Sequence, residues 1–335
     1  PAADEPRARG ATVEERDAIV GAIERLTMAA NERNAEAARA VTDRSFTAIG
    51  ESWAFVAKGY PGWANRREEI PGARIAAIVR TVVLYTGDVA FAEGFFRTTG
   101  LKADQAGDFS STVLKREGKW RVAAVRFAPL HFEPPFHYAI TPRHGRQEGW
   151  VTLFDGKSLE ALAGMDGGAP PEEWSIDEGV LKLTPPAKRA NGGYRGLRTR
   201  ETYTSFELEF EWKIAEKGNS GVKYGLCYLT GGDGAGREYQ VVDEHGDGGA
   251  INDPRERSGS LYAQIAPSQS VARPLGEFNS GRIVVRGRHA EHWLNGVKVV
   301  EYEAAFDPLD SPIVLQNHST PVWYRNIRIR RLPER

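Results

Sequence analysis

Short segments in which apolar and polar residues alternate recur through the second half of the chain, and this pattern constrains its fold more than any other feature. Residues two apart lie on the same face of a strand, so such segments predict half-buried β-strands. The predicted strands cover residues 174–176, 180–183, 203–214, 221–229, 238–242, 281–286, 289–294, 297–302, 313–316 and 323–330. Asn295 and Gly296 separate two of them and suit a type I′ hairpin turn. Almost no helical period interrupts the series, which predicts an all-β sandwich of two sheets, such as a jelly roll.

The first part of the chain has a different pattern. Ile19, Ile23 and Leu26 recur at helical spacing after a capping box of Thr12 and Glu15, which predicts an amphipathic helix. A short helix is predicted at 35–41, and strands are predicted at 45–49, 74–85, 89–99, 108–116 and 120–127. Helices followed by a curved antiparallel sheet predict an α+β domain.

The chain has 335 residues, enough for two domains that each bury a core. Residues 1–10 lack periodicity and are predicted to be a disordered leader. The α+β domain is predicted at 11–130, a Pro-rich linker at 131–146 and the β-sandwich at 147–335.

The composition narrows the range of partners. The formal net charge is -1, which provides no field to attract nucleic acid, and no apolar run approaches the roughly 20 residues that cross a bilayer. We therefore expect a small molecule as the ligand, no nucleic acid and no membrane span. The lone cysteine, Cys227, is expected in the core. The chain begins with Pro1, and a removed signal peptide would explain this start, so we expect a periplasmic or secreted protein.

Two polar side chains mark the segment 237–245 as the candidate site. Glu238 and Gln240 lie two apart and therefore share an accessible face of the predicted strand, with Asp243 and His245 at its end. A polar cleft is the functional interpretation. The alternative is the solvated face of an ordinary antiparallel sheet.

The order and spacing of motifs along residues 147–335 resemble one known family. The marks include Leu-Phe-Asp-Gly-Lys-Ser-Leu at 153–159, Gly-Asn-Ser-Gly-Val at 218–222, Glu-Tyr-Gln-Val-Val-Asp at 238–243, His-Trp-Leu-Asn-Gly at 292–296, Gln-Asn-His at 316–318 and Trp-Tyr-Arg-Asn-Ile at 323–327. This half is similar to the 3-keto-disaccharide hydrolase domain, which has a concanavalin-like jelly roll. Asn317 is a departure, because the family more often has Asp there.

The first domain resembles the SnoaL-like, nuclear-transport-factor-2-like superfamily. The resemblance rests on its helix-then-sheet order and on Ser-Ser-Thr-Val-Leu-Lys-Arg-Glu-Gly-Lys-Trp-Arg-Val at 110–122. It implies a cone-shaped half-barrel that could serve a homodimer or capture substrate, and it leaves function open.

The resemblance of residues 147–335 to the 3-keto-disaccharide hydrolase domain implies action on glycosides already oxidised at sugar C3. A C3 ketone acidifies the C2 proton, so a base can remove it, the C1 substituent can leave, and water can add. A divalent cation (Ca, Mn or Mg) or a cationic side chain would stabilise the enolate.

Roles follow for individual residues. Glu238 is the first choice as base or metal ligand, His318 and His245 are further catalytic candidates, and Asp243 is a second metal ligand. The predicted substrate-binding residues are Gln240, Lys223, Asn219, Tyr262 and Trp323. Three alternatives stay open: a carbohydrate-binding module without catalysis, an ordinary glycoside hydrolase with two carboxylates, and catalysis in the cone of the first domain.

Overall fold

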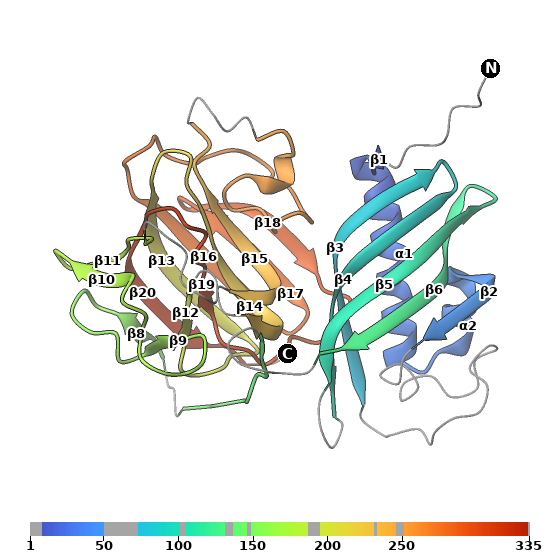
Figure 1. The fold of residues 1–335 in the computed structure, drawn as a ribbon, viewed down its shortest axis with the longest axis horizontal. Coiled ribbons are helices and arrows are strands. Elements are labelled where there is room, and N and C mark those ends of the chain that lie inside the picture. The colour runs from blue at the N-terminus through green and yellow to red at the C-terminus, as the bar shows by residue number, and fades with distance from the viewer. Residues whose placement is uncertain are drawn as a thin grey trace. The chain divides into compact units, whose positions relative to one another are not determined.

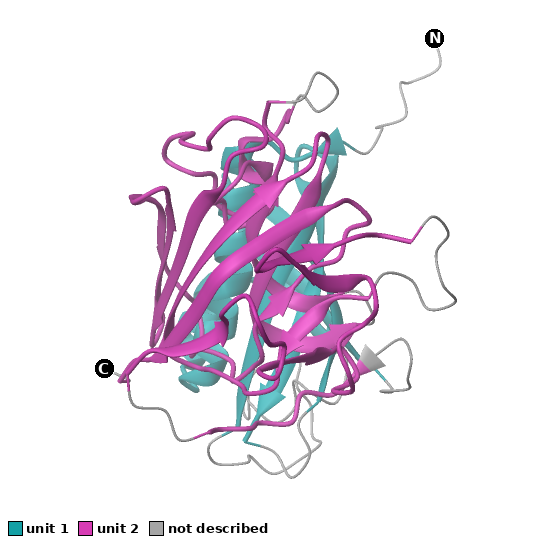
Figure 2. Ribbon diagram, turned by 90° about the vertical axis from the view of Figure 1, so that its left-hand side faces the viewer, with its two compact units in different colours: residues 1–130 teal, residues 131–335 magenta. Residues whose placement is uncertain are grey.

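The computed structural model describes residues 9–49, 73–100, 105–130, 137–145, 149–186, 195–230, 233–245 and 251–333. The chain divides into two compact units, residues 1–130 and 131–335 (Figure 2). Each unit has its own hydrophobic core. The unit boundary therefore falls where the Pro-rich stretch begins.

Unit 1 combines two helices with an antiparallel sheet (Figure 1). Its elements are β1 (Arg9–Gly10), α1 (Val13–Asn31), α2 (Ala35–Val41), β2 (Thr42–Ile49), β3 (Arg74–Thr86), β4 (Val89–Thr99), β5 (Ala106–Arg116) and β6 (Lys119–Pro129), with the sheet in the order β1-β3-β4-β5-β6-β2. All neighbours pair antiparallel except β2 and β6, which are parallel. Ile19, Ile23 and Leu26 of α1 are buried in the core with the sheet, as their spacing predicts.

The start of unit 1 corrects one prediction and confirms another. The capping box of Thr12 and Glu15 is present. Arg9 and Gly10, predicted to be part of a disordered leader, instead pair with β3 as β1. The Glu15 carboxylate that completes the capping box also binds the Arg9 guanidinium at 2.7 Å, so the helix cap holds this strand in place. Residues 1–8 of the predicted leader lie outside the described part of the chain.

Unit 2 consists of two antiparallel sheets (Figure 1). One has the order β10-β11-β20-β13-β16-β17-β18, with β8 beside β20, and the other has the order β15-β14-β19-β12-β9, with β7 beside β14. Their bounds are β7 (His137–Tyr138), β8 (Val151–Phe154), β9 (Leu162–Gly164), β10 (Trp174–Asp177), β11 (Val180–Leu183), β12 (Leu197–Thr199), β13 (Phe206–Ile214), β14 (Asn219–Thr230), β15 (Gly234–Val242), β16 (Asn279–Arg286), β17 (His289–Leu294), β18 (Val297–Glu303), β19 (Val314–Leu315) and β20 (Val322–Arg331). A short 3-10 helix, η1, covers Pro254–Glu256. We call the two sheets the eight-stranded and the six-stranded sheet.

The inner faces of these two sheets share one core. Trp212 and Tyr324 come from the eight-stranded sheet, and Val222 and Tyr239 come from the six-stranded sheet; all four are buried in it. Because side chains alternate along a strand, the residues between them face outward. Each sheet therefore has an outer face away from the core.

Several details follow from local sequence. Asn295 and Gly296 have φ of 50° and 81°, which confirms the predicted hairpin. Cys227 is free and buried, as expected. Residues 137–138 lie within the predicted linker, yet they pair with β14 as β7. None of the described helices has the length and apolar character that crossing a membrane requires.

Candidate active site

The candidate residues of the six-stranded sheet meet on its outer face. In the pairing of β14 with β15, Lys223 lies opposite Glu238 and Gly221 lies opposite Gln240. Their neighbour Val222 is buried in the core between the sheets. The prediction that Glu238 and Gln240 share a face is therefore confirmed, and Lys223 joins them.

Glu238 and Gln240 are buried, and the prediction of an accessible face is wrong in this respect. Their exposed fractions are 7% and 2%. A Cβ added to Gly221 would lie 2.3 Å from Glu238 Oε1, so the carboxylate folds over the space that this glycine leaves. With its amide oriented as a donor, the Gln240 nitrogen lies 3.2 Å from Glu238 Oε1 and 2.9 Å from the carbonyl oxygen of Ser220.

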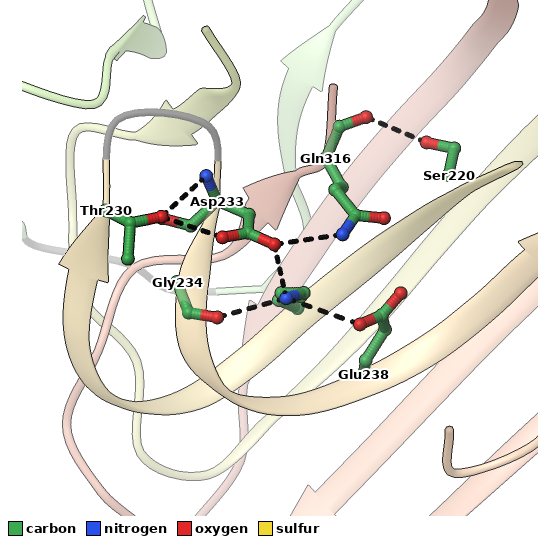
Figure 3. Close-up of polar contacts among 7 residues, drawn as sticks. Ser220, Thr230, Asp233, Gly234, Glu238 and Gln316 are labelled. Atoms are coloured by element: carbon green, nitrogen blue, oxygen red, sulfur yellow. Dashed lines mark hydrogen bonds and ion pairs between the residues drawn. The ribbon is translucent and has the colours of Figure 1, made fainter. Parts of the chain in front are cut away.

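Lys223 forms the centre of a charged network with Glu238. Figure 3 labels Glu238, Asp233 and Gly234, which take part in it. Its ammonium lies 3.3 Å from Glu238 Oε2 and 2.6 Å from Asp233 Oδ2. It also donates to the carbonyl oxygen of Gly234 at 3.1 Å. An ammonium has three protons, and these three acceptors account for all of them. Lys223 thus holds Glu238 in place and has no proton left for a sugar, which corrects its predicted role in substrate binding.

Asp233 and Gln316 complete the network, and neither was predicted as a site residue. Asp233 Oδ2 also accepts from Gln316 Nε2 at 2.9 Å, and Asp233 Oδ1 accepts from Thr230 Oγ1 at 2.7 Å. Gln316 Oε1 is buried without a hydrogen-bond partner among the described residues. A buried acceptor of this kind could receive a hydroxyl of a bound sugar.

Charge balance sets the ionisation of this network. Burial opposes the charge on Lys223, but Glu238 and Asp233 outweigh it and raise the pKa of the ammonium. Burial likewise opposes the charge on Asp233, yet Lys223 outweighs it and lowers the pKa of that carboxyl. Lys223 is therefore a cation and Asp233 an anion at neutral pH.

Asn219 and His318 come together at one end of the same sheet. The Asn219 backbone N–H donates to Thr320 Oγ1 at 2.9 Å, and this hydroxyl donates back to the Asn219 carbonyl at 2.8 Å. His318 is exposed in the loop before Thr320. The loop is fixed further by Asn317, whose Oδ1 accepts from the Ser319 N–H at 3.0 Å. An exposed imidazole on a fixed loop suits proton transfer.

Tyr262 lies along the edge strand next to Glu238. Its backbone N–H donates to the carbonyl oxygen of Glu238 at 3.0 Å, and the side chain is half-buried. The structure thus brings Tyr262 to the site.

Trp323 is separated from the site. It lies on β20 of the eight-stranded sheet, and its neighbours Val322 and Tyr324 are buried in the core. Its indole therefore lies on the outer face of the opposite sheet, where the Lys213 ammonium stacks 4.8 Å from the ring centre. This corrects its predicted role beside Glu238.

The predicted pairing of Glu238 with Asp243 at a metal does not fit the geometry. Asp243 lies just beyond the end of β15 at Val242. Its two carboxylate oxygens accept backbone N–H groups from Lys217 at 2.8 Å and from His245 at 2.9 Å. His245 is exposed and, with Asp243 and Trp212, borders a cavity of about 10 Å³. Asp243 and His245 are thus turn residues that lie apart from Glu238.

Another group of potential metal ligands lies on the eight-stranded sheet. One ligand atom each of His289, Glu291 and Glu301 lies within 4.8 Å of the others. Lys298 already binds Glu301 at 2.6 Å and Glu291 at 3.5 Å. This group also lies away from Glu238.

Residues 149–330 match the family model of the 3-keto-alpha-glucoside-1,2-lyase-like domain. A curated relative from Bacteroides thetaiotaomicron, named 3-keto-disaccharide hydrolase, is 30% identical over 229 residues, which are 55% of this chain and 78% of that protein.

Two solved structures resemble separate parts of the chain. One, from Parabacteroides distasonis, has a provisional assignment as a glycosyl hydrolase, with 23% identity and a TM-score of 0.49 over 55% of this chain and 95% of that one. The other is a nuclear-transport-factor-2-like protein of unknown function from Shewanella oneidensis, with 16% identity and a TM-score of 0.26 over 33% of this chain and 96% of that one.

Proposed function

Because the chain belongs to the 3-keto-alpha-glucoside-1,2-lyase-like domain family and is thus a hydrolase or lyase of glycosidic bonds, we propose that it cleaves glycosides oxidised at C3. Glu238 removes the C2 proton, and the electron pair moves toward the C3 ketone as an enolate. Collapse of the enolate expels the C1 substituent and leaves a C1–C2 double bond. Water then adds its oxygen at C1, and Glu238 returns a proton to C2. The observation that carries this proposal is one buried carboxylate, Glu238, fixed between the Lys223 ammonium and the Gln240 amide.

The fixed geometry of Glu238 supports its role as the base. Binding to Lys223 and Gln240 restricts the carboxylate before the substrate arrives, which reduces the reorganisation required during proton transfer. Its burial also keeps bulk water away from the reacting proton. His318, exposed at the Asn219 end of the sheet, donates the proton that the leaving group needs.

The structure disfavours the two-carboxylate alternative. A glycosidase acid must hold its proton near neutral pH, which requires a raised pKa. Asp233 is the other carboxylate of the network, but its pKa is lowered. Both of its oxygens are also bound, by Lys223, Gln316 and Thr230.

Aglycone release tests the proposal directly. The protein is incubated with a nitrophenyl glucoside and with its 3-keto derivative, with and without chelator. We expect release from the keto form alone, and a loss of at least about a hundredfold in Glu238→Gln and in His318→Ala. Glu301→Gln, a carboxylate variant on the other sheet, should retain activity.

The other outcomes separate the alternatives. Release from the unoxidised glucoside would favour an ordinary glycosidase. Release from neither substrate, with sugar binding retained, would favour a binding module. Exchange of the C2 proton with D₂O by wild type but not by Glu238→Gln would assign the base independently of cleavage.

A further inference from the structure

A polar groove of about 750 Å³ lies on the outer face of the eight-stranded sheet. The residues that matter for its chemistry are Glu209, Glu211, Arg282, Trp293, Asn326 and Arg328. Glu238 belongs to the outer face of the other sheet, so the core of the sandwich lies between this groove and the candidate active site.

A β-bulge gives the groove its shape. The pairing of β13 with β20 shifts between Glu209 and Glu211, because their partners Arg328 and Arg325 lie three residues apart. Asn326 lies within this bulge and has a φ of 52°. A bulge bends its strand and turns a side chain in a new direction. Here it brings the Asn326 amide into the groove, where Nδ2 donates to Glu211 Oε1 at 2.7 Å.

Two glutamates of the groove, Glu209 and Glu211, are already paired with arginines. Glu209 Oε2 accepts from Arg328 Nε at 2.7 Å, and Glu211 Oε2 accepts from Arg325 Nε at 2.8 Å. A carboxylate can accept about four hydrogen bonds, so both glutamates retain acceptor capacity for a ligand. Their side chains are 31% and 30% exposed. The groove thus offers fixed donors and acceptors. Asp155, which also lines it, is held by the backbone N–H groups of Lys157 and Ser158.

Trp293 provides an apolar surface beside these groups. Its indole N–H donates to Glu291 Oε2 at 2.8 Å, and the Arg282 guanidinium lies 5.0 Å from the ring centre. These contacts fix the orientation of the half-buried ring. An oriented aromatic ring next to a few fixed polar groups is typical of a small-molecule site.

We propose that this groove binds a neutral oligosaccharide. The apolar C–H face of a sugar ring would pack on Trp293, and its hydroxyls would bond with Glu209, Glu211 and Asn326. A charged ligand would find its counter-ions already paired, so the groove selects an uncharged one. Binding here needs no oxidation at C3 and is independent of turnover at Glu238.

Titration calorimetry on the full chain tests this site, with unoxidised maltohexaose, cellohexaose and laminarihexaose as probes. We expect at least one of them to bind, and Trp293→Ala to weaken its binding by about tenfold or more. Ser280→Arg, which adds a bulky side chain at an exposed position lining the groove, should weaken binding in the same way. Glu238→Gln and Trp323→Ala should leave binding unchanged.

Four results would overturn the proposal. They are a failure of all three probes to bind, unchanged binding in both groove variants, loss of binding in Glu238→Gln, and tighter binding of a sulfated than of a neutral hexasaccharide. The third would place the sugar at Glu238, and the fourth would show that charge selects the ligand. A loss of turnover in Glu238→Gln with hexasaccharide binding retained would separate the two sites.

Discussion

Protonation of the buried His292 should limit the stability of unit 2 in mild acid. His292 is completely buried on β17, with Nδ1 3.0 Å from the carbonyl oxygen of Gly259 and Nε2 2.6 Å from the hydroxyl of Tyr224. A neutral ring satisfies both contacts when Nδ1–H donates to the carbonyl and Nε2 accepts from the hydroxyl. Burial lowers the pKa of His292 from 6.5 to about 4.

The size of the stability loss follows from the difference between the pKa of His292 in the folded and in the unfolded chain. Below pH 6.5 the unfolded chain takes up a proton at this ring, whereas the folded chain stays neutral until about pH 4. The unfolded state then binds more protons, so the stability contributed by the neutral ring is lost as the pH falls. The loss relative to neutral pH is about 2 kcal/mol at pH 5 and about 3 kcal/mol at pH 4.

Urea unfolding of wild type and His292→Gln between pH 7.5 and 4.5, followed by tryptophan fluorescence, measures this effect. Other groups titrate in the same range, so the difference between the two proteins is the relevant quantity. Wild type should lose about 2 kcal/mol more than the variant between pH 7.5 and pH 5. A difference that does not change with pH would refute the assignment of a neutral, buried ring.

His289, two residues earlier on β17, provides a control of opposite sign. Burial opposes its charge, but hydrogen bonds to Glu303 and Glu291 outweigh burial and raise its pKa. The stabilisation from a raised pKa is complete below 6.5 and is lost as the pH rises through the folded value. The stability difference between wild type and His289→Gln should therefore grow as the pH falls.

Three further predictions concern the two outer faces. Lys223→Met leaves Glu238 and Asp233 without their cation and should lower the free energy of unfolding at pH 7 by about 3–5 kcal/mol. Urea titration measures this loss, and a change below about 1 kcal/mol would contradict the buried network. Gly221→Ala should lower kcat on the 3-keto substrate by about tenfold or more, because its Cβ displaces the Glu238 carboxylate. Gly87→Ala, where a Cβ meets nothing within 4 Å, is the matched control, and equal activity in both variants would contradict the placement of Glu238. Trp323→Ala should leave kcat/KM for that substrate within about twofold of wild type, since the indole lies on the opposite outer face; a larger loss would return Trp323 to the site.

Alternation along β15 predicted which side chains share a face, but it could not predict what covers that face. Glu238 and Gln240 lie together because residues two apart always do. Their burial depends on Gly221 and Lys223 of the neighbouring strand, and hence on strand register. Register is a long-range property that the local pattern of one strand does not contain.

The sheet to which Trp323 belongs could not be predicted from the sequence either. Its segment was correctly predicted as a strand, but the sequence does not say which of two sheets a strand joins. Pairing with β13 places it in the eight-stranded sheet and turns its indole away from Glu238. The aromatic residue that does reach the site, Tyr262, comes from a loop that bonds to the edge strand.

Asp233 was missed because it lies in the Gly-Gly-Asp-Gly run between two strands, where acidic residues usually serve the turn itself. Its hydrogen bonds with Thr230 do serve the turn. Its second oxygen, however, binds Lys223 and Gln316. The available signal was a lysine inside a strand ten residues earlier, because a buried lysine requires a carboxylate nearby.

The network of Lys223, Glu238 and Asp233 also restricts where the negatively charged oxygen of the enolate can lie. Asp233 and Glu238 share the single positive charge of Lys223, so the cluster retains one negative charge. That charge favours proton removal by Glu238 but would repel an enolate oxygen placed next to it. The protons of Lys223 are all used, so its ammonium cannot stabilise that oxygen. The C3 oxygen should therefore point away from the two carboxylates, toward the end of the sheet where Asn219 lies. Glu238 would then act at the C2 proton, His318 at the leaving group on C1, and groups near Asn219 at the C3 oxygen.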